Sequence, residues 1–162
     1  MWKMLCTVAA VLSTTSPAYA GCWSAEPASA ARVRDLQTFL MVETLRCQAV
    51  GFNIATEYNA FVKANRSAIG NANDRLKAFF IGSAGSVYGQ TAYDRFTTAL
   101  ANSYGAGRTN ADSCEAARGV AVEAALMAGS YEGLTMLADR QGLDPVLPGG
   151  RCGEQTVAEL TP

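Results

Sequence analysis

The sequence predicts an all-α, single-domain bundle of five or six helices held together by two disulfides. Apolar side chains recur at helical spacing through most of the chain, and no stretch shows the strict alternation of a half-buried strand. Glycine- and asparagine-containing turns separate the helical stretches. Four cysteines follow residue 20, an even number that fits two bridges in an oxidising compartment.

Residues 1–20 have the pattern of an export signal. Lys3 precedes a short apolar core over residues 4–12, and Ala18-Tyr19-Ala20 forms a small-x-small cleavage site. The apolar core is shorter than the roughly 20 residues of a membrane-spanning helix. We therefore expect cleavage after Ala20, a periplasmic or secreted protein, and no transmembrane segment.

The domain is then expected over residues 21–162, with a loosely ordered tail over residues 152–162. A lipoprotein is the alternative, because Gly21-Cys22 could end a lipoprotein cleavage site with lipid on Cys22. Residue 19 would then usually be leucine, whereas here it is tyrosine. Anchoring through Cys22 is therefore the less favoured prediction.

The stretch from Ala28 to about Val50 predicts the helix at the centre of the bundle. Its apolar residues cover several sides rather than one stripe, which is typical of a helix surrounded by other elements. Ser24 and Pro27 suit the start of a helix, and Gly51 suits its end. We expect the remaining helices to pack around this one.

Glu43 interrupts the apolar stripe of this central helix. It lies one turn from Phe39, Leu40 and Cys47, where an unpaired charge would be costly. We expect it to pair with Arg46, three residues later, or with an arginine of a neighbouring helix. The alternative is a buried carboxylate of raised pKa that lines a pocket, which would make Glu43 a candidate functional residue.

A second helix is predicted over residues 52–64, and its pattern continues to about residue 81. Asparagines and a glycine in between weaken the pattern, so residues 52–81 could form one kinked helix or two. Residues 82–89 (GSAGSVYG) predict a flexible connector.

The second half of the chain predicts three more helices. Residues 90–104 give the cleanest amphipathic pattern. Asp112 and Ser113 can cap an alanine-rich helix that runs to about residue 128, and a short last helix follows over residues 131–138. Beyond it, the sequence DPVLPGGRCG is rich in turn residues.

The four cysteines Cys22, Cys47, Cys114 and Cys152 allow three disulfide connectivities. If residues 52–81 act as one kinked arm, Cys47 meets Cys114 and Cys22 meets Cys152; if they form a hairpin, Cys22 meets Cys114. We favour the first arrangement. The loop-entropy model gives a Cys47–Cys114 bridge about 4 kcal/mol of stabilisation.

Composition excludes several chemistries. Histidine is absent, so there is no serine–histidine or cysteine–histidine nucleophile pair and no histidine-bearing metal site. No two cysteines have the CxxC spacing, and we expect neither a metal nor a cofactor. The net charge is −1 and the basic residues are scattered, which does not indicate a nucleic-acid partner.

Two other kinds of site are compatible with the residues present. Aromatic side chains at helical spacing could line a cavity for a small apolar ligand, although such stripes are more often simply core. Carboxylates could support glycan hydrolysis if two of them converge. The candidate cavity residues are Tyr58, Phe61, Phe80, Tyr93 and Phe96, and the candidate carboxylates are Glu43, Glu57, Asp94 and Glu123.

Short motifs are spread along the chain from Cys22 to Cys152. They are Cys22-Trp23, Arg34-Asp35-Leu36-Gln37-Thr38, Leu40-Met41-Val42, Leu45-Arg46-Cys47, Tyr58-Asn59, Phe61-Val62 and Leu147-Pro148-Gly149-Gly150-Arg151-Cys152. Together they resemble a group of small exported proteins from alphaproteobacteria. The resemblance implies a Gram-negative periplasm and ordinary cleavage before Cys22-Trp23. That group has no established activity, so the resemblance assigns no functional residue.

The sequence thus favours a non-enzymatic, secreted or periplasmic helical protein that acts through a protein or cell-envelope partner. A carrier of small apolar ligands and a carboxylate-based glycan hydrolase are the two alternatives. Neither the identity of the partner nor the oligomeric state follows from the residues.

Overall fold

The computed structural model describes residues 21–153, so the predicted signal at residues 1–20 and the tail from residue 154 lie outside the described residues. Between Gly21 and Gly153 the chain forms helices and no strand of a sheet, which confirms the all-α bundle. Residues 141–153 are non-helical and are called the C-terminal strap below. The five helices of this part are α1 (Ala25–Ala49), α2 (Ala55–Ala64), α3 (Arg66–Gly105), α4 (Ala111–Leu126) and α5 (Tyr131–Arg140).

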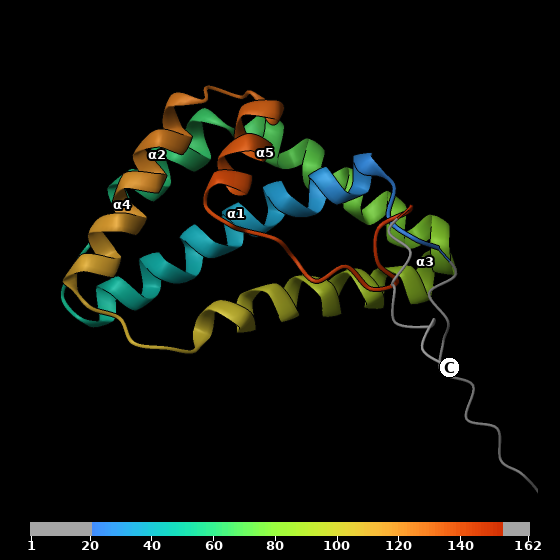
Figure 1. Ribbon diagram of the computed structural model, residues 1–162, viewed down its shortest axis with the longest axis horizontal. Coiled ribbons are helices and arrows are strands. Elements are labelled where there is room, and N and C mark those ends of the chain that lie inside the picture. Colours follow the sequence, from blue (N-terminus) through green and yellow to red (C-terminus); the bar gives the residue numbers. More distant parts are fainter. Residues whose placement is uncertain (1–20, 154–162) are drawn as a thin grey trace, which may run out of the picture.

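Helix α1 runs through the middle of the bundle, as the sequence predicts (Figure 1). It contacts each of the other four helices, and most extensively α3. Val33, Leu36 and Leu40 are spaced three and four residues apart, so they share one face, and all three are fully buried. This face supplies the centre of the hydrophobic core.

The segment that the sequence left open, residues 52–81, belongs to two helices. Asn65 separates them, because its backbone (φ −113°, ψ 20°) ends α2 and begins α3. Its fully buried side chain also joins distant parts of the chain. Nδ2 donates to the carbonyl oxygens of Phe61 (3.0 Å) and Ala124 (2.8 Å), and Oδ1 accepts the N–H of Gly129 (2.8 Å).

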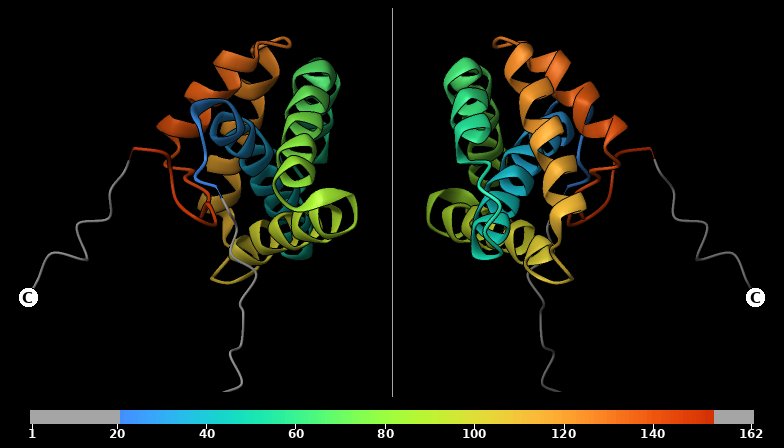
Figure 2. Two further views of the ribbon diagram at one scale, coloured as in Figure 1. Left: turned by 90° about the vertical axis from the view of Figure 1, so that its right-hand side faces the viewer. Right: turned by 90° about the vertical axis from the view of Figure 1, so that its left-hand side faces the viewer.

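The prediction of a flexible connector over residues 82–89 is wrong. Helix α3 continues through it and breaks at a single residue, Gly85, whose φ of 76° and ψ of 169° turn the chain back. Only glycine adopts this φ without a steric penalty. A Cβ on Gly89 would lie 2.5 Å from the carbonyl oxygen of Phe80, so a second glycine lets the two arms of α3 touch. Figure 2 shows how the first arm (66–84) and second arm (86–105) diverge.

The start of α4 also differs from the prediction. Asn110 is the cap, rather than Asp112 or Ser113. Its side chain accepts the N–H of Ser113 (2.9 Å), while the Ser113 hydroxyl accepts the N–H of Asn110 (3.0 Å). This reciprocal pair satisfies backbone donors at both positions, which a single capping side chain cannot do.

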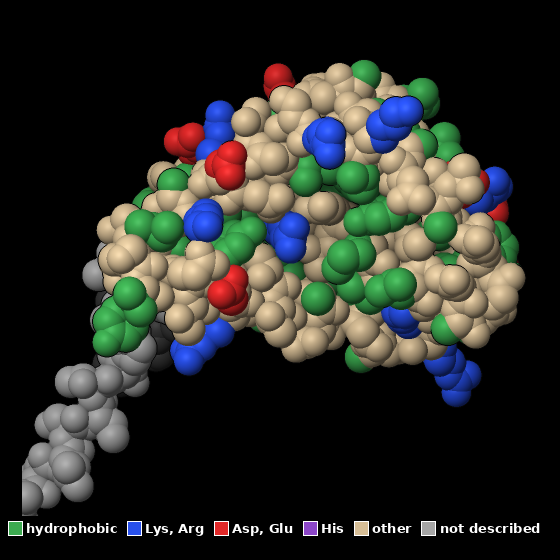
Figure 3. All heavy atoms as spheres, turned by 180° about the vertical axis from the view of Figure 1, so that it is seen from behind, with side chains coloured by type: hydrophobic (Ala, Val, Ile, Leu, Met, Phe, Trp, Pro, Cys, Tyr) green, Lys and Arg blue, Asp and Glu red, His purple; other side chains and the backbone are tan. Residues whose placement is uncertain are grey.

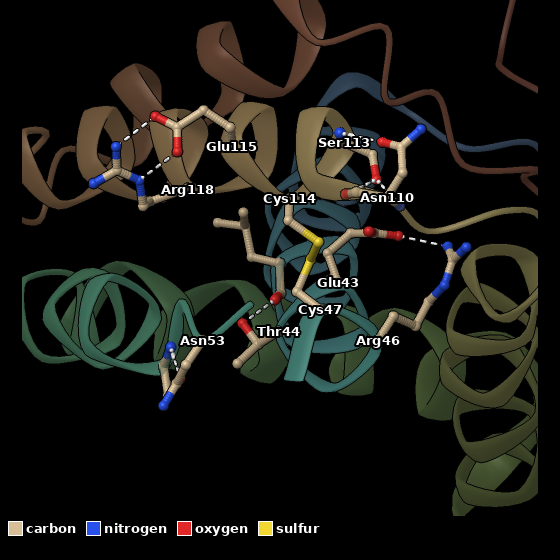
Figure 4. Close-up of a disulfide and its surroundings, with 12 residues drawn as sticks. Glu43, Thr44, Arg46, Cys47, Asn53, Asn110, Ser113, Cys114, Glu115 and Arg118 are labelled. Atoms are coloured by element: carbon tan, nitrogen blue, oxygen red, sulfur yellow. Dashed lines mark hydrogen bonds and ion pairs between the residues drawn. A yellow bond between two sulfur atoms is a disulfide. The ribbon is translucent and has the colours of Figure 1, made fainter. Parts of the chain in front are cut away.

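Two disulfides link Cys47 to Cys114 and Cys22 to Cys152, which confirms the favoured connectivity. Both sulfurs of the first bridge are fully buried, where it joins the end of α1 to the first turn of α4 (Figure 4). The second bridge is exposed and ties the start of the described chain to the strap. The two bridges therefore sit in opposite environments.

We predict that Asn65→Ala lowers the free energy of unfolding by about 3 kcal/mol, because it removes two hydrogen bonds to buried carbonyl oxygens and leaves the Gly129 N–H without its partner. Urea unfolding measures the change. Asn59→Ala is the matched control, since Asn59 is exposed on α2 and should change stability by less than about 0.5 kcal/mol. Equal effects of the two substitutions would contradict this role for Asn65.

Candidate functional site

The C-terminal strap is fastened to the beginning of the domain by Trp23. The indole is 2% exposed, and its Nε1 donates to the carbonyl oxygen of Pro148 (2.8 Å). The Trp23 backbone forms a β-bridge with Arg151. The Trp23 N–H donates to the carbonyl oxygen of Gly150 (2.9 Å), and the Trp23 carbonyl oxygen accepts the N–H of Cys152 (3.0 Å). The Cys22–Cys152 disulfide adds a covalent link beside it. The strap, drawn in orange-red, therefore lies along the bundle although it has no helix of its own (Figure 1).

A cleft of about 200 Å³ lies where the strap meets α1 and the second arm of α3. Its walls are mainly apolar, but two carboxylates belong to them, one from α1 and one from the strap. One wall residue, Val146, is 87% exposed and marks the rim. The lining residues are Asp35, Phe96, Ala99, Leu100, Ser103, Tyr104, Asp144, Pro145 and Val146.

Asp35 is the buried acid of this cleft. The residue is only 2% exposed, and its Oδ1 accepts a hydrogen bond from the Tyr104 hydroxyl (2.8 Å). Oδ2 has no hydrogen-bond or ion-pair partner among residues 21–153. Burial, opposed by the Tyr104 hydrogen bond and helped by the charge of Asp144, raises the pKa of Asp35 from 3.8 to about 6. Desolvation also raises the pKa of Tyr104, which therefore stays protonated.

The other acid of the cleft, Asp144, is already paired. Its Oδ1 accepts from Arg151, also on the strap, and lies 3.7 Å from the guanidinium of Arg32. Arg32 in turn pairs with Asp139 at 3.0 Å. Arg32 and Arg151 thus form ion pairs with Asp139 and Asp144. Asp35 remains without a cation in the described part of the chain, although it is mostly ionised at neutral pH.

The predicted candidate Glu43 lies at a different place. It is 7% exposed and pairs with Arg46, whose Nη1 lies 2.6 Å from its Oε1 (Figure 4). The same guanidinium nitrogen donates to the carbonyl oxygen of Tyr104 (2.7 Å). Glu43 thus takes part in an ion pair that attaches α1 to the end of α3.

The other carboxylates considered for hydrolysis do not meet at one place. Glu57 on α2 lies 3.9 Å from Arg118, and Glu123 on α4 pairs with Arg140 of α5. Asp94 on α3 accepts a hydrogen bond from Gln90 (3.0 Å). Each acid therefore has its own partner, and none of the three lines the Asp35 cleft.

The aromatic residues predicted to line a cavity lie in or against the hydrophobic core. Phe80 is fully buried between Trp23 and Phe96, with ring centroids 5.5 Å away in each case. Tyr58 packs beside the fully buried Phe61 at 6.2 Å, and Tyr93 beside Phe80 at 6.3 Å. Of these five aromatic residues, Phe96 also forms a wall of the Asp35 cleft.

The sequence interpretation missed Asp35, although a signal was present. Asp35 lies one helical turn from Ala31 and one from Phe39, so it stands between two apolar neighbours, as Glu43 does. Arg46 lies three residues after Glu43, and Arg32 lies three residues before Asp35, so spacing alone favours an ion pair for each acid. In the structure Arg32 pairs with Asp139 instead. Tyr104 and Asp144 could not be found, because only the fold brings α3 and the strap to α1.

The Cys22–Cys152 disulfide bears on the lipoprotein alternative. The sulfur that a lipid would occupy is bonded to Cys152, and one sulfur cannot form both bonds. Within residues 21–153 no helix has the length and apolarity needed to cross a bilayer. In the same range no three acidic or cysteine side chains gather to form a metal site.

Apolar side chains that face solvent are distributed over several elements. Those on the back of the molecule lie between scattered Lys, Arg and acidic side chains (Figure 3). Val146 on the strap lines the cleft, Val50 lies in the turn after α1, and the others lie on helices. The exposed large apolar residues are Met41, Leu45, Val50, Val87, Tyr88, Val122, Leu126, Met136 and Val146.

No family model matches the chain, and neither a curated protein nor a solved structure matches it significantly. The resemblance to small exported alphaproteobacterial proteins therefore stays a prediction. The function has to be argued from the residues of the cleft itself.

We predict that Asp35→Asn stabilises the protein at neutral pH. Because the pKa of Asp35 is raised to about 6 by folding, the acid loses its proton more easily in the unfolded chain. Its contribution to the free energy of unfolding is full below about pH 4 and is lost as the pH rises through about 6. A shift of about two units corresponds to about 3 kcal/mol. Asp35→Asn should therefore gain up to about 3 kcal/mol at about pH 7.5 and nothing at about pH 3.5.

Urea unfolding at a series of pH values measures this difference. The control is Asp94→Asn, because Asp94 is an exposed acid that already accepts a hydrogen bond. It should follow the wild-type pH profile within about 0.5 kcal/mol. An Asp35→Asn protein that is less stable than the wild type at neutral pH would mean that the ionised acid has a cationic partner.

We also predict that dithiothreitol reduces Cys22–Cys152 before Cys47–Cys114 under native conditions. Thiol–disulfide exchange requires access to a sulfur, and of the two bridges only Cys22–Cys152 is exposed. Alkylation of the released thiols, followed by peptide mass mapping over time, distinguishes the two bridges. Equal labelling of all four cysteines from the earliest time would contradict the difference in burial.

Proposed function

We propose that this protein is an exported, non-enzymatic binding protein that holds a protein partner at the Asp35 cleft. The observation that carries the proposal is a buried carboxylate with one free oxygen, in a cleft with apolar walls and an exposed rim. An unpaired buried charge lowers stability, so its presence in a cleft is typical of a functional site.

The size of the cleft favours a protein partner over a free ligand. Sites for drug-sized molecules usually measure about 300–1,000 Å³, whereas this cleft measures about 200 Å³. Such a volume suits a single side chain that projects from a larger surface. The exposed Val146 at the rim would then contact the surface around that side chain.

A glycan hydrolase has less support. It would need two carboxyl groups free to act as acid and as base or nucleophile. Of the two acids in the cleft, Asp144 is engaged by Arg151 and approached by Arg32, and Asp35 has no cation from residues 21–153. A carrier of apolar ligands also has less support. Trp23, Phe80 and Phe96 pack against one another, so their rings leave no room for a ligand between them.

Export agrees with the same features. Disulfides persist in oxidising compartments, and two of them are formed here. The cleavage proposed after Ala20 would place the new N-terminus two residues before Trp23. The Cys22–Cys152 disulfide would then attach the strap to the N-terminus as soon as the exported chain is oxidised.

We predict that a photo-crosslinking residue at position 146 captures a discrete partner in intact cells of the source organism. Val146 is exposed on the rim of the cleft, so its replacement by p-benzoylphenylalanine should leave the fold intact. Leu126 is the matched control, because it is 77% exposed on α4, a helix that does not line the cleft. Immunoblotting and mass spectrometry identify the products.

The crosslink at position 146 should weaken when Asp35→Asn is added, while Asp94→Asn should leave it unchanged. Crosslinks of equal yield at positions 126 and 146 would contradict a specific cleft. The absence of any crosslink at position 146, with the protein folded and oxidised in the envelope, would count against a protein partner.

A further inference from the structure

We infer that the cleft binds a lysine side chain, with the ammonium group on the free oxygen of Asp35 and the methylene stem along Phe96, Leu100 and Pro145. The inference rests on the proposed function and names the chemistry by which the partner is recognised. It follows from charge, from the number of free acceptor atoms and from the apolar walls.

The negative charge of the cleft favours a cation as its ligand. Asp35 is mostly ionised at neutral pH, and its negative charge has no counter-ion among residues 21–153. The arginines nearby, Arg32 and Arg151, are directed to Asp139 and Asp144 instead. A bound cation would therefore replace solvation that burial has removed from Asp35.

The acceptor atoms favour an ammonium group over a guanidinium. Arginine binds carboxylates best through two parallel hydrogen bonds, one to each oxygen. Oδ1 of Asp35 already accepts the Tyr104 hydroxyl at 2.8 Å, so a second bond there would have to use its other lone pair, whereas Oδ2 has no partner among residues 21–153. The remaining oxygen can accept a bond from a compact ammonium group, which acts as a point charge and needs no planar partner.

The walls favour the lysine stem. Four methylenes can pack against an apolar surface while the charged end reaches a polar atom. Phe96 and Leu100 are each 6% exposed, and the strap adds Pro145 and Val146 on the other side. A shorter amine would leave this apolar surface open. The volume of about 200 Å³ is suited to one such side chain.

The groups that face Asp35 make it the one that titrates near neutral pH. Tyr104 of α3 has a raised pKa and keeps its proton, while Asp144 of the strap is held by Arg151. The ammonium of lysine stays charged, with a pKa of about 10.4. Binding should thus weaken about tenfold between about pH 7.5 and about pH 5, as Asp35 takes up a proton.

The test uses the oxidised protein labelled with ¹⁵N and the probe Nα-acetyl-lysine N-methylamide. Amide chemical shifts in NMR spectra report binding and locate it. We expect shifts around Asp35 and Tyr104, with an affinity at least about tenfold higher than that of the norleucine analogue, which lacks the ammonium group. The arginine analogue should bind more weakly than the lysine probe.

Asp35→Asn should weaken lysine binding at least about tenfold and abolish its pH dependence. Asp94→Asn is the control and should behave as the wild type. Equal affinity for the norleucine and lysine probes, or unchanged binding by Asp35→Asn, would overturn the inference. The pH dependence of the wild type is a second readout that needs no variant, and its absence would also overturn the inference.

The two proposals can fail separately. Lysine binding without a crosslink from position 146 would remove the protein partner and leave the amine site. A specific crosslink from position 146 without lysine binding would keep the partner and remove the lysine.

Discussion

The burial of Trp23 is the contact on which both the fold and the cleft depend. Its ring contacts Phe79 and Phe80 on the first arm of α3 and Phe96 on the second. Its backbone and Nε1 hold the strap. One side chain thus connects the start of the domain, both arms of a bent helix and the last described residues. Phe96, which packs on it, continues directly into the cleft wall.

This arrangement explains why an uncompensated acid can persist on the central helix. Helix α1 is covered on several sides, so any acid on it has to be paired or lose stability. Glu43 is paired with Arg46, whereas Asp35 keeps a raised pKa and one free oxygen. The disulfides and the aromatic contacts stabilise the fold and so oppose this loss. A local conflict of this kind, in an otherwise consistent core, is expected at a functional site.

Much of the fold could be predicted because local patterns determine it. The apolar residues around its circumference predict the central helix, and the disulfide pairing is predicted if residues 52–81 run as one kinked arm rather than as a hairpin. The break at Gly85 was overlooked because a glycine-rich stretch looks like a loop, although one left-handed residue is enough to turn a helix. Asn110 was missed as a cap because Asp112 and Ser113 are equally good caps by residue type.

The site was harder to predict than the fold because it is made by contacts between distant parts of the chain. No residue near Asp35 in the sequence indicates that it contacts Tyr104, 69 residues later, or that it lies beside the strap. Residue type alone does not separate Asp35 from the surface acids, because burial is what distinguishes them. Helical spacing does indicate that it lies between Ala31 and Phe39, and that signal deserved the weight given to Glu43.

The strap links the cleft to the compartment in which the protein would work. It has no helix, and it is held by Trp23 together with an exposed disulfide. Reduction of that bridge would leave the hydrogen bonds to Trp23, the Arg32–Asp144 ion pair and the packing of residues such as Leu143 to keep Asp144 and Val146 over Asp35. With the wall gone, Asp35 would be solvated and its attraction for a cation would fall toward that of a surface acid. The proposed binding site would be complete only where the bridge is oxidised, which agrees with the export predicted from residues 1–20.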